Sequence, residues 1–387
     1  MINRQNALKH LMDLLKIEGL SGREGNVAAA IREKLMAAGC RQAWIKHDRS
    51  HKKISGEFDV GNLIVKLPGT IRDDRRLFMG HMDTVPLCRG AVPAKRGNRI
   101  VSRGQTALGA DNRTAVACMV SVIETIVKKD LPRPPLTFLF TIAEEIGLLG
   151  AKCVDVNDLG NPAMGFNIDS GDPNHMMIAA IGADRWEVDV LGISAHAGVH
   201  PEDGISAAAI TALAIADVVK RGYFGKVVKG RKRGTSNVGS MEGGEASNQV
   251  TDLVRITGES RSHDNVFLKE ITSAYKTAFQ KAAKQVKNKA GKAGRIRFKS
   301  EKDYDAFKMD RKSPAVKHAV KVAKALDLKP RLTSVDGGLD ANYMNQKGIP
   351  TITLGAGQHH PHTVNEYVDI KEYITGCELA LALATGA

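Results

Sequence analysis

The sequence has no run of about 18 uncharged apolar residues, so we expect no membrane-spanning helix. Its first residues, MINRQNALKH, lack the apolar core of a secretory signal, which predicts a cytoplasmic protein. The five cysteines are odd in number and contain no CxxC pair: Cys40, Cys88, Cys118, Cys153 and Cys377. This pattern argues against a sulfur-ligated zinc and favours reduced thiols over disulfides. Any bound metal must therefore be held by histidines and carboxylates.

The chain also lacks an aromatic-interleaved RNA motif and a DNA-recognition helix signature, although its net charge is +14. Much of the positive excess lies in residues 220–233 and 281–299. Charge alone speaks to solubility and to steering of ligands. We therefore interpret the basic segments as a solvated face that attracts anionic ligands, and we expect no nucleic-acid partner.

With 387 residues the chain exceeds what one hydrophobic core usually organises, so two domains are expected. Residues 6–15 and 24–38 have apolar positions at helical spacing, and Ser21 with Glu24 predicts a capping box for the second of these helices. Residues 62–69 and 75–80 read as strands, 112–129 as a helix, and 136–142 as a strand apolar throughout, typical of a parallel sheet covered on both faces. The pattern indicates α/β architecture.

The pattern changes near residue 185. Strand-like and helix-like segments follow in the order β, α, β, β, α, β, with a long helix over 265–289, as in a ferredoxin-like sandwich. The α/β rhythm resumes after residue 313 with a helix over 315–328 and a strand over 349–355. We predict a discontinuous catalytic domain, 1–184 and 305–387, with a mixed and mostly parallel sheet. Residues 185–304 form an inserted ferredoxin-like α+β domain.

Several apolar segments end in residue types that bind metals, and a further aspartate lies in GADN. These residues are His81 and Asp83 in GHMD, Asp111 in GADN, Glu144 and Glu145 in IAEE, Asp169 in NID, and His362 in HHPH. Ligands of parallel α/β sheets bind outside the carboxyl ends of the strands, so these side chains can converge although they are distant in sequence.

Two imidazoles and three carboxylates suit a two-metal site. If Asp111 bridges, each metal receives one histidine, one further carboxylate and the shared one, with a position left for water. Two metals about 3.5 to 4 Å apart can hold a hydroxide and polarise a carbonyl. Zinc is favoured, and cobalt or manganese would also fit. Side chains alternate after a strand, so one of Glu144 and Glu145 can bind metal while the other acts as a base, and Asp83 can orient His81.

The motifs GHMDTVP, GADN, AEEIGLLGA, NIDSGD, SAHAGVHPEDG, GGLDAN and HTVNEYV resemble, in order and spacing, the co-catalytic dizinc peptidases that include aminoacylase, glutamate carboxypeptidase and peptidase T. The resemblance covers essentially the whole chain, and AEEIGLLGA with GADN and GGLDAN looks most like the peptidase T branch. It implies that His81, Asp111 and Asp169 bind one zinc. Asp111, Glu145 and His362 would bind the other, with Glu144 as general base and Asp83 orienting His81.

In this family the inserted domain is a lid and dimerisation module. The resemblance implies that His196 in SAHAG stabilises the oxyanion, often across a dimer, that Arg261 holds a substrate carboxylate, and that Asn248 lies near the substrate. Many relatives have a second aspartate where this chain has Asn112, which is not a ligand position. Because histidines also precede the last ligand, His360 is the substitute for His362 if the loop register differs.

These features predict a dizinc aminopeptidase of the peptidase T kind that acts on short peptides such as tripeptides, and the resemblance implies a homodimer. Related amidohydrolases, namely an N-acyl amino acid deacylase, a dipeptidase or a carboxypeptidase, need the same site and remain alternatives. A catalytically silent binding protein is a further alternative, which the presence of Glu144 argues against. Nucleic-acid binding through the basic inserted domain is a third alternative, which nothing in the sequence demands.

Overall fold

The computed structural model describes residues 1–386 and contains two compact units. Unit 1 comprises Met1–Ala179, Lys308–Val335 and Leu339–Ala387, and unit 2 comprises Ala180–Phe307 with Asp336–Gly338. Unit 2 is thus inserted in the sequence of unit 1. None of the helices in residues 1–386 is both long and apolar enough to cross a membrane.

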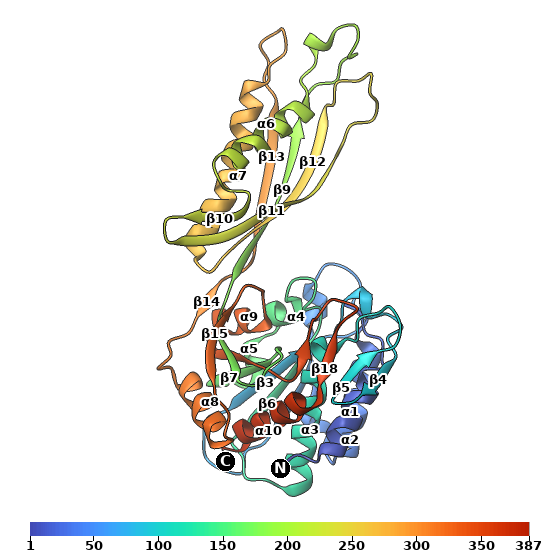
Figure 1. Ribbon diagram of the computed structural model, residues 1–387, viewed down its shortest axis with the longest axis vertical. Helices are drawn as coiled ribbons and strands as arrows, with labels where there is room; N and C mark the ends of the chain where they lie inside the picture. The colour runs from blue at the N-terminus through green and yellow to red at the C-terminus, as the bar shows by residue number, and fades with distance from the viewer. Residues whose placement is uncertain (387) are drawn as a thin grey trace. The chain divides into compact units, whose positions relative to one another are not determined.

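Unit 1 is built on a nine-stranded sheet (Figure 1). Its centre is parallel and consists of β6 (Leu136–Thr141), β3 (Arg76–His81), β7 (Met164–Ile168) and β16 (Thr351–Leu354), in that order. Antiparallel neighbours β2 (Leu63–Leu67) and β8 (His175–Ala180) flank this centre. The remaining strands are β1 (Ile45–His47), β14 (Phe307–Lys308) and β15 (Arg331–Val335). The predicted mixed, mostly parallel α/β class is confirmed.

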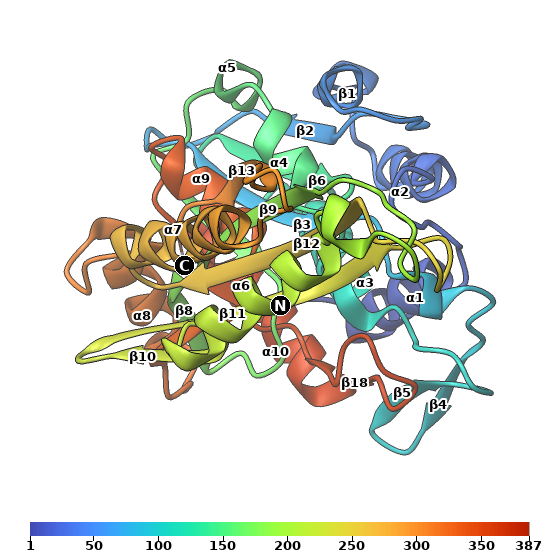
Figure 2. The same ribbon diagram turned by 90° about the horizontal axis from the view of Figure 1, so that it is seen from above.

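Every residue of β3 and β6 is buried, because helices cover both faces of the sheet. Helices α3 (Ala110–Lys129) and α10 (Ile370–Thr385) pack together on one side, and α4 (Leu149–Cys153) and α9 (Asp340–Gln346) lie on the other (Figure 2). The other helices of unit 1 are α1 (Arg4–Leu14), α2 (Gly25–Ala37), α5 (Val156–Leu159) and α8 (Pro314–Ala325). A second sheet, which the sequence did not predict, joins β17 (Gln358–His359), β18 (Tyr367–Asp369), β5 (Arg99–Ser102) and β4 (Pro93–Arg96).

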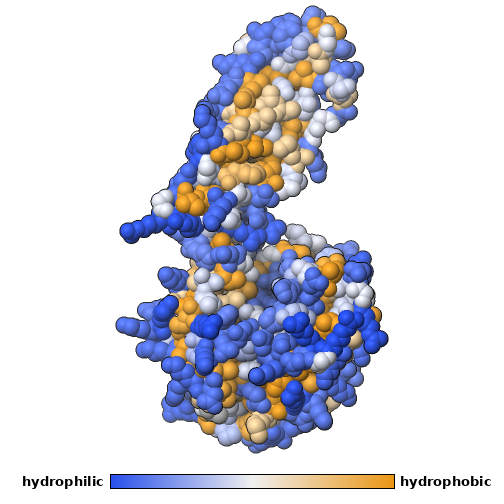
Figure 3. Space-filling view, in the orientation of Figure 1, coloured by the Kyte–Doolittle hydropathy of each residue, from blue (hydrophilic) through white to orange (hydrophobic). Residues whose placement is uncertain are grey.

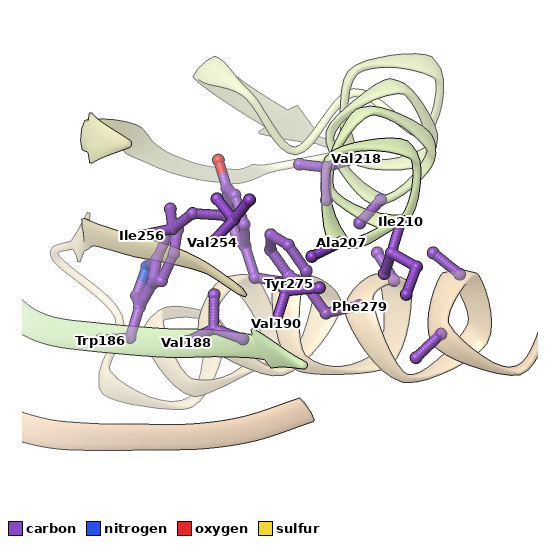
Figure 4. Close-up of a cluster of buried hydrophobic side chains, with 14 of the residues drawn as sticks. Trp186, Val188, Val190, Ala207, Ile210, Val218, Val254, Ile256, Tyr275 and Phe279 are labelled. Carbon is purple, nitrogen blue, oxygen red and sulfur yellow. The ribbon is translucent and has the colours of Figure 1, made fainter. Parts of the chain in front are cut away.

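Unit 2 has an antiparallel sheet in the order β10 (Gly225–Lys229), β11 (Lys232–Gly243), β12 (Leu253–Ser262), β9 (Gly182–Leu191) and β13 (Arg295–Tyr304). Apart from β10, this is the expected ferredoxin-like order. Helices α6 (Ala207–Lys220) and α7 (Asn265–Gln285) bury their apolar sides against the sheet. Figure 4 shows Trp186 and Ile256 of the strands facing Tyr275 and Phe279 of α7. This cluster forms the core of unit 2.

The predicted capping box at the start of α2 is wrong. The helix begins at Gly25, and its N-terminal cap, Glu24, makes no capping hydrogen bond with its side chain. The Ser21 hydroxyl instead donates to Asp83, and Glu24 accepts from the N–H groups of Gly22 and Ala143. The polar side chains that a local pattern assigned to a helix end therefore bind distant segments of the chain.

Candidate metal centre

The candidate ligands gather at the carboxyl ends of the parallel strands of unit 1. His81 is the last residue of β3, Asp169 directly follows β7, and Glu144 and Glu145 follow β6 after a short turn. Asp111 lies at the start of α3, where its backbone angles are not helical. Strand topology thus brings distant parts of the sequence to one edge of the sheet.

Asp111 lies between two histidines. Its Oδ1 is 3.0 Å from Nε2 of His81, and its Oδ2 is 3.6 Å from Nε2 of His362. His362 Nε2 is also 2.9 Å from Oε1 of Glu145. Ligand atoms of His81, Asp111 and Glu145 all lie within 4.8 Å of one another. Each oxygen of Asp111 therefore faces a different imidazole, which is the arrangement a bridging carboxylate needs.

Asp169 belongs to the same cluster. Burial and then the charge of nearby Asp111 raise the pKa of Asp169, so the two carboxyl groups are close enough to interact. The Gln358 side-chain amide donates to Asp169 Oδ1 at 3.1 Å and fixes its orientation. Asn112, by contrast, is fully buried and donates to the Ile168 carbonyl, so it supports the loop.

The carboxylates are crowded and poorly solvated. Burial raises the pKa of Glu144 and of Asp169 well above their usual range, and it raises the pKa of Glu145 as well. Among residues 1–386, no lysine or arginine forms an ion pair with any of these three carboxyl groups or with Asp111. The excess of negative charge calls for cations. The nitrogen and oxygen donors present suit divalent metal ions, zinc among them.

The histidines respond to the same charges. Burial disfavours protonated His81, but hydrogen bonds with Asp111 and Asp83 outweigh it and raise the pKa well above its usual value. The hydrogen bond with Glu145 raises the pKa of His362 to about 9. The carboxylates therefore hold both imidazoles in place electrostatically.

Asp83 supports His81 and the glutamate turn together. His81 Nδ1 is 3.1 Å from the Asp83 carbonyl oxygen and 3.3 Å from its Oδ1. The fully buried Asp83 carboxylate also accepts the N–H groups of Glu144 at 3.0 Å and Glu145 at 3.2 Å. A histidine Nδ1 held by oxygens leaves Nε2 free to bind a metal.

The two glutamates do not diverge by strand alternation, as the sequence suggested. Strand β6 ends at Thr141, and Ala143 has a φ of 52°, in the left-handed region. The chain therefore turns before Glu144. The Glu145 carboxylate contacts His362, whereas no hydrogen bond to the Glu144 carboxylate occurs among residues 1–386. The two neighbouring side chains consequently have different surroundings.

The histidine loop before α10 has the geometry that its spacing suggested. His362 contacts Glu145, while the ring of His360 lies 5.7 Å from the ring of Tyr367. His359 stacks on the same tyrosine and contacts Glu372. His362 is thus the histidine of this loop that reaches the cluster.

Sequence reasoning missed several supporting polar residues. Glu366 is 2% exposed and accepts three backbone N–H groups, from Leu108 and Gly109 at 2.7 Å and from Asp111 at 2.9 Å. Its only signal was a charged residue four positions after His362. The other missed residues, Ser21, Glu24 and Asn62, come from the N-terminal segments.

The expected substrate residues lie in unit 2. The Asn248 carbonyl accepts the Ala197 N–H at 2.9 Å, so Asn248 and His196 are neighbours. His196 Nδ1 accepts the Gly198 N–H at 3.2 Å, which assigns the ring proton to Nε2 and makes that atom a donor.

Arg261 is not with them. Arg261 lies on β12 and pairs with Ala183 near the start of the neighbouring strand β9, whereas His196 follows the end of β9. Its guanidinium forms a bidentate pair with Glu259, with N–O distances of 2.9 and 3.0 Å. Arg261 and His196 thus occupy opposite ends of one sheet.

Comparisons with known proteins cover both units. A family model, peptidase family M20/M25/M40, matches residues 77–386. The uncharacterised protein YqjE of Bacillus subtilis is 31% identical over 386 residues, covering 99% of this chain and 98% of its own.

Among solved structures, the aminopeptidase PepT from Bacillus cereus has a TM-score of 0.86 and 31% identity, covering 99% of this chain and 98% of its own. A tripeptidase from Staphylococcus aureus has a TM-score of 0.88 and 30% identity, covering 100% and 98%. A dinuclear metal binding peptidase of the M20 family from Bacillus subtilis shares the fold at a TM-score of 0.72 and 15% identity, covering 99% and 97%.

Proposed function

Because the chain belongs to peptidase family M20/M25/M40 and is therefore a hydrolase, we propose that it is a metal-dependent aminopeptidase that removes the N-terminal residue of short peptides, tripeptides included. One observation carries the proposal: two histidines and three carboxylates meet at one sheet edge, next to the separate carboxylate of Glu144. The likeness to a PepT aminopeptidase and to a tripeptidase favours this activity over deacylation.

We assign His81, Asp111 and Asp169 to one metal and Asp111, Glu145 and His362 to a second. The two oxygens of Asp111, each facing a different imidazole, support the shared position. When bound, two zinc ions, or cobalt or manganese, would polarise the substrate carbonyl and acidify a water molecule. Asp83 and Gln358 orient the ligands His81 and Asp169.

Glu144 is the proposed general base. Burial and the neighbouring carboxylates Asp169, Asp340 and Glu145 hold its pKa above the usual range, which suits a group that takes a proton from the attacking water and returns it to the leaving amine. Because Glu144 is not among the assigned ligands, it can exchange protons without disturbing them.

We further propose that the Nε2–H group of His196 donates a hydrogen bond to the developing oxyanion and that Asn248 contacts the substrate beside it. The tautomer fixed by Gly198 supports the first role, since a donor aimed at developing charge stabilises the transition state. Arg261 would bind a substrate carboxylate, in competition with Glu259, its present partner.

A homodimer through unit 2 is the proposed assembly. Helix α6 is apolar on its outer side as well as its inner one, with Leu213 46% and Val219 53% exposed beside exposed alanines. Figure 3 shows apolar surface over the helical face of this unit. Exposed apolar side chains that gather on one side of a surface helix are commonly covered by a partner.

The test combines metal analysis with a substrate panel on one preparation. We expect about two equivalents of metal, with tripeptides cleaved faster than dipeptides and with release of the N-terminal residue. Removal of the metal with a chelator should abolish activity, and zinc should restore it. N-blocked tripeptides and N-acyl amino acids serve as matched substrates without a free amine. Activity confined to the blocked compounds would refute the aminopeptidase assignment and favour a deacylase.

A further inference from the structure

We propose that Ser21 and Glu24 are positioning residues for hydrolysis, because they fix the turn that presents Glu144. The inference rests on the proposed function, in which Glu144 is the general base. Both side chains lie outside the ligand set, and both come from the segment before α2 that the sequence marked as a helix cap.

The N–H groups of the turn after β6 are all held by side chains. Four consecutive N–H groups, those of residues 142–145, each donate to a side-chain oxygen. The acceptors are Asn62 for residue 142 at 3.0 Å, Glu24 for residue 143 at 2.9 Å, and Asp83 for residues 144 and 145 at 3.0 and 3.2 Å. All three acceptor residues are fully buried. Water therefore does not compete for these donors, and each acceptor restrains the backbone.

Glu24 acts at the residue where restraint matters most. Ala143 is held at a φ of 52°, a conformation that a residue with a Cβ adopts rarely and keeps only when its surroundings enforce it. Its N–H donates to Glu24, and its carbonyl accepts from the Leu149 N–H at 3.0 Å. The same Glu24 oxygen accepts the Gly22 N–H at 3.0 Å, which ties the turn to the segment before α2.

Ser21 acts on the turn indirectly, through Asp83. Its hydroxyl donates to Asp83 Oδ2 at 2.6 Å, the oxygen that also accepts the Glu145 N–H. Asp83 therefore has its rotamer set by Ser21 on one side and holds Glu144 and Glu145 on the other. Glu24 thus binds the N–H of residue 143 directly, and Ser21 orients the Asp83 carboxylate that binds the N–H groups of residues 144 and 145.

A base must sit within hydrogen-bond reach of the proton it takes, and displacement of a reacting group by about 1 Å can cost about 100-fold in rate. Without Glu24 the Ala143 N–H loses its acceptor and the left-handed turn can relax. Glu144 would then shift relative to the ligands, while substrate binding would be unaffected. The predicted effect is on kcat and not on KM.

The experiment measures kcat, KM and zinc affinity, the last by competition with a chromophoric chelator. Glu24→Ala should lower kcat about 10- to 100-fold, with KM and zinc affinity within about threefold of wild type. Glu24→Gln keeps a carbonyl oxygen for both N–H donors and should recover kcat to within about threefold. Arg23→Ala is the matched control and should show wild-type kinetics, because the Arg23 guanidinium pairs with Glu57 and Asp59 at the surface.

A double-variant cycle tests the route through Glu144. If Glu24 acts through the base, Glu24→Ala should change the residual rate of Glu144→Gln by less than about threefold. A full additional loss in that background would overturn the proposal, as would wild-type kcat in Glu24→Ala at saturating zinc. A loss of zinc affinity that zinc excess repairs would overturn it too, because Glu24 would then act through Glu145.

Two outcomes separate this inference from the function on which it rests. If Glu144→Gln is inactive and Glu24→Ala is fully active, the positioning role of Glu24 is refuted and the role of Glu144 as base stands. Full activity of Glu144→Gln refutes the base, and the role of Glu24 falls with it. If Glu24→Ala does not fold, Ser21→Ala gives the answer: kcat about 3- to 10-fold lower with KM unchanged supports the proposal, and unchanged kcat contradicts it.

Discussion

Glu144 and Glu145 are adjacent in the chain, yet their surroundings assign them different chemistry. Glu145 contacts His362 at 2.9 Å and belongs to the donor cluster. Glu144 shares the burial and the raised pKa of that cluster without a histidine contact. A carboxylate that is near the ligands and is not one of them can change its protonation state during a reaction. Substitution of each glutamate in turn can therefore test whether the two have different roles.

Glu144→Gln should retain about two equivalents of zinc and lose at least about 100-fold in kcat, because an amide cannot accept the water proton. Glu145→Gln is the matched control and should lose zinc from one position, since it removes a proposed ligand. Metal content and single-turnover rates on a tripeptide measure both. Zinc loss in Glu144→Gln would show that Glu144 is a ligand instead.

Glu366 gives a second prediction at this scale. Its two oxygens accept three N–H groups of the loop that carries Asp111. Glu366→Gln replaces one oxygen by an NH2 group, which leaves at least one buried N–H facing a donor. We expect zinc affinity to fall about 10- to 100-fold, as for other groups that orient ligands. Glu378→Gln, which alters only a bond to the Ile2 N–H, should keep wild-type affinity in the same competition assay.

Among the elements, the buried and mainly apolar ones were predictable. Strands β3, β6 and β16 are buried along their whole length, and most of their residues are apolar or threonine. The sheet formed by β4, β5, β17 and β18 was not predicted, because its strands have two to four residues and carry charged side chains. Short strands gain most of their stability from partners distant in sequence, and no local pattern records those partners.

Within the site, the proposed ligands were predictable from the sequence and the residues that support them were not. The proposed ligands were found because strand ends locate them and because their residue types bind metals. Glu24 and Glu366 bind backbone N–H groups, which every residue except proline has, so nothing in the sequence identifies the partner. The SxxE pattern at Ser21 predicted the local hydrogen bonds of a capping box. Glu24 instead accepts the Ala143 N–H of the buried turn, and Ser21 donates to Asp83.

Strand β12 offers a prediction on packing. A Cβ at Gly258 would lie 2.2 Å from the Trp186 ring and 2.5 Å from the Asn237 carbonyl oxygen. Trp186 is 1% exposed and has no room to move, so Gly258→Ala should destabilise unit 2 by about 1 to 3 kcal/mol. Gly239→Ala on neighbouring β11 is the control, because its nearest neighbour would be at 3.8 Å. Thermal unfolding with tryptophan fluorescence compares them, and equal stability of the two variants would contradict the argument.

At the scale of the whole molecule, the chain separates its tasks between two units. The proposed metal ligands, the base and their supporting acceptors all belong to unit 1. Unit 2 has its own core around Trp186 and Phe279, and it carries the proposed substrate residues and the exposed apolar side of α6. Changes to the outer side of α6 can therefore be made without touching the metal ligands or either core.

Leu213→Glu combined with Val219→Glu tests the proposed dimer. Both side chains are about half exposed, so the substitution costs little in a monomer, whereas two helices facing each other would bury four carboxylates. We expect wild type to sediment as a dimer and the variant as a monomer, with unchanged zinc affinity. Val266→Glu, at a position that is 73% exposed on α7, is the control and should remain dimeric.

If His196 acts across the dimer, kcat of the monomeric variant should fall together with dimer content, and His196→Ala should add no further loss. A wild-type monomer at assay concentration would refute both the dimer and the cross-subunit role of His196.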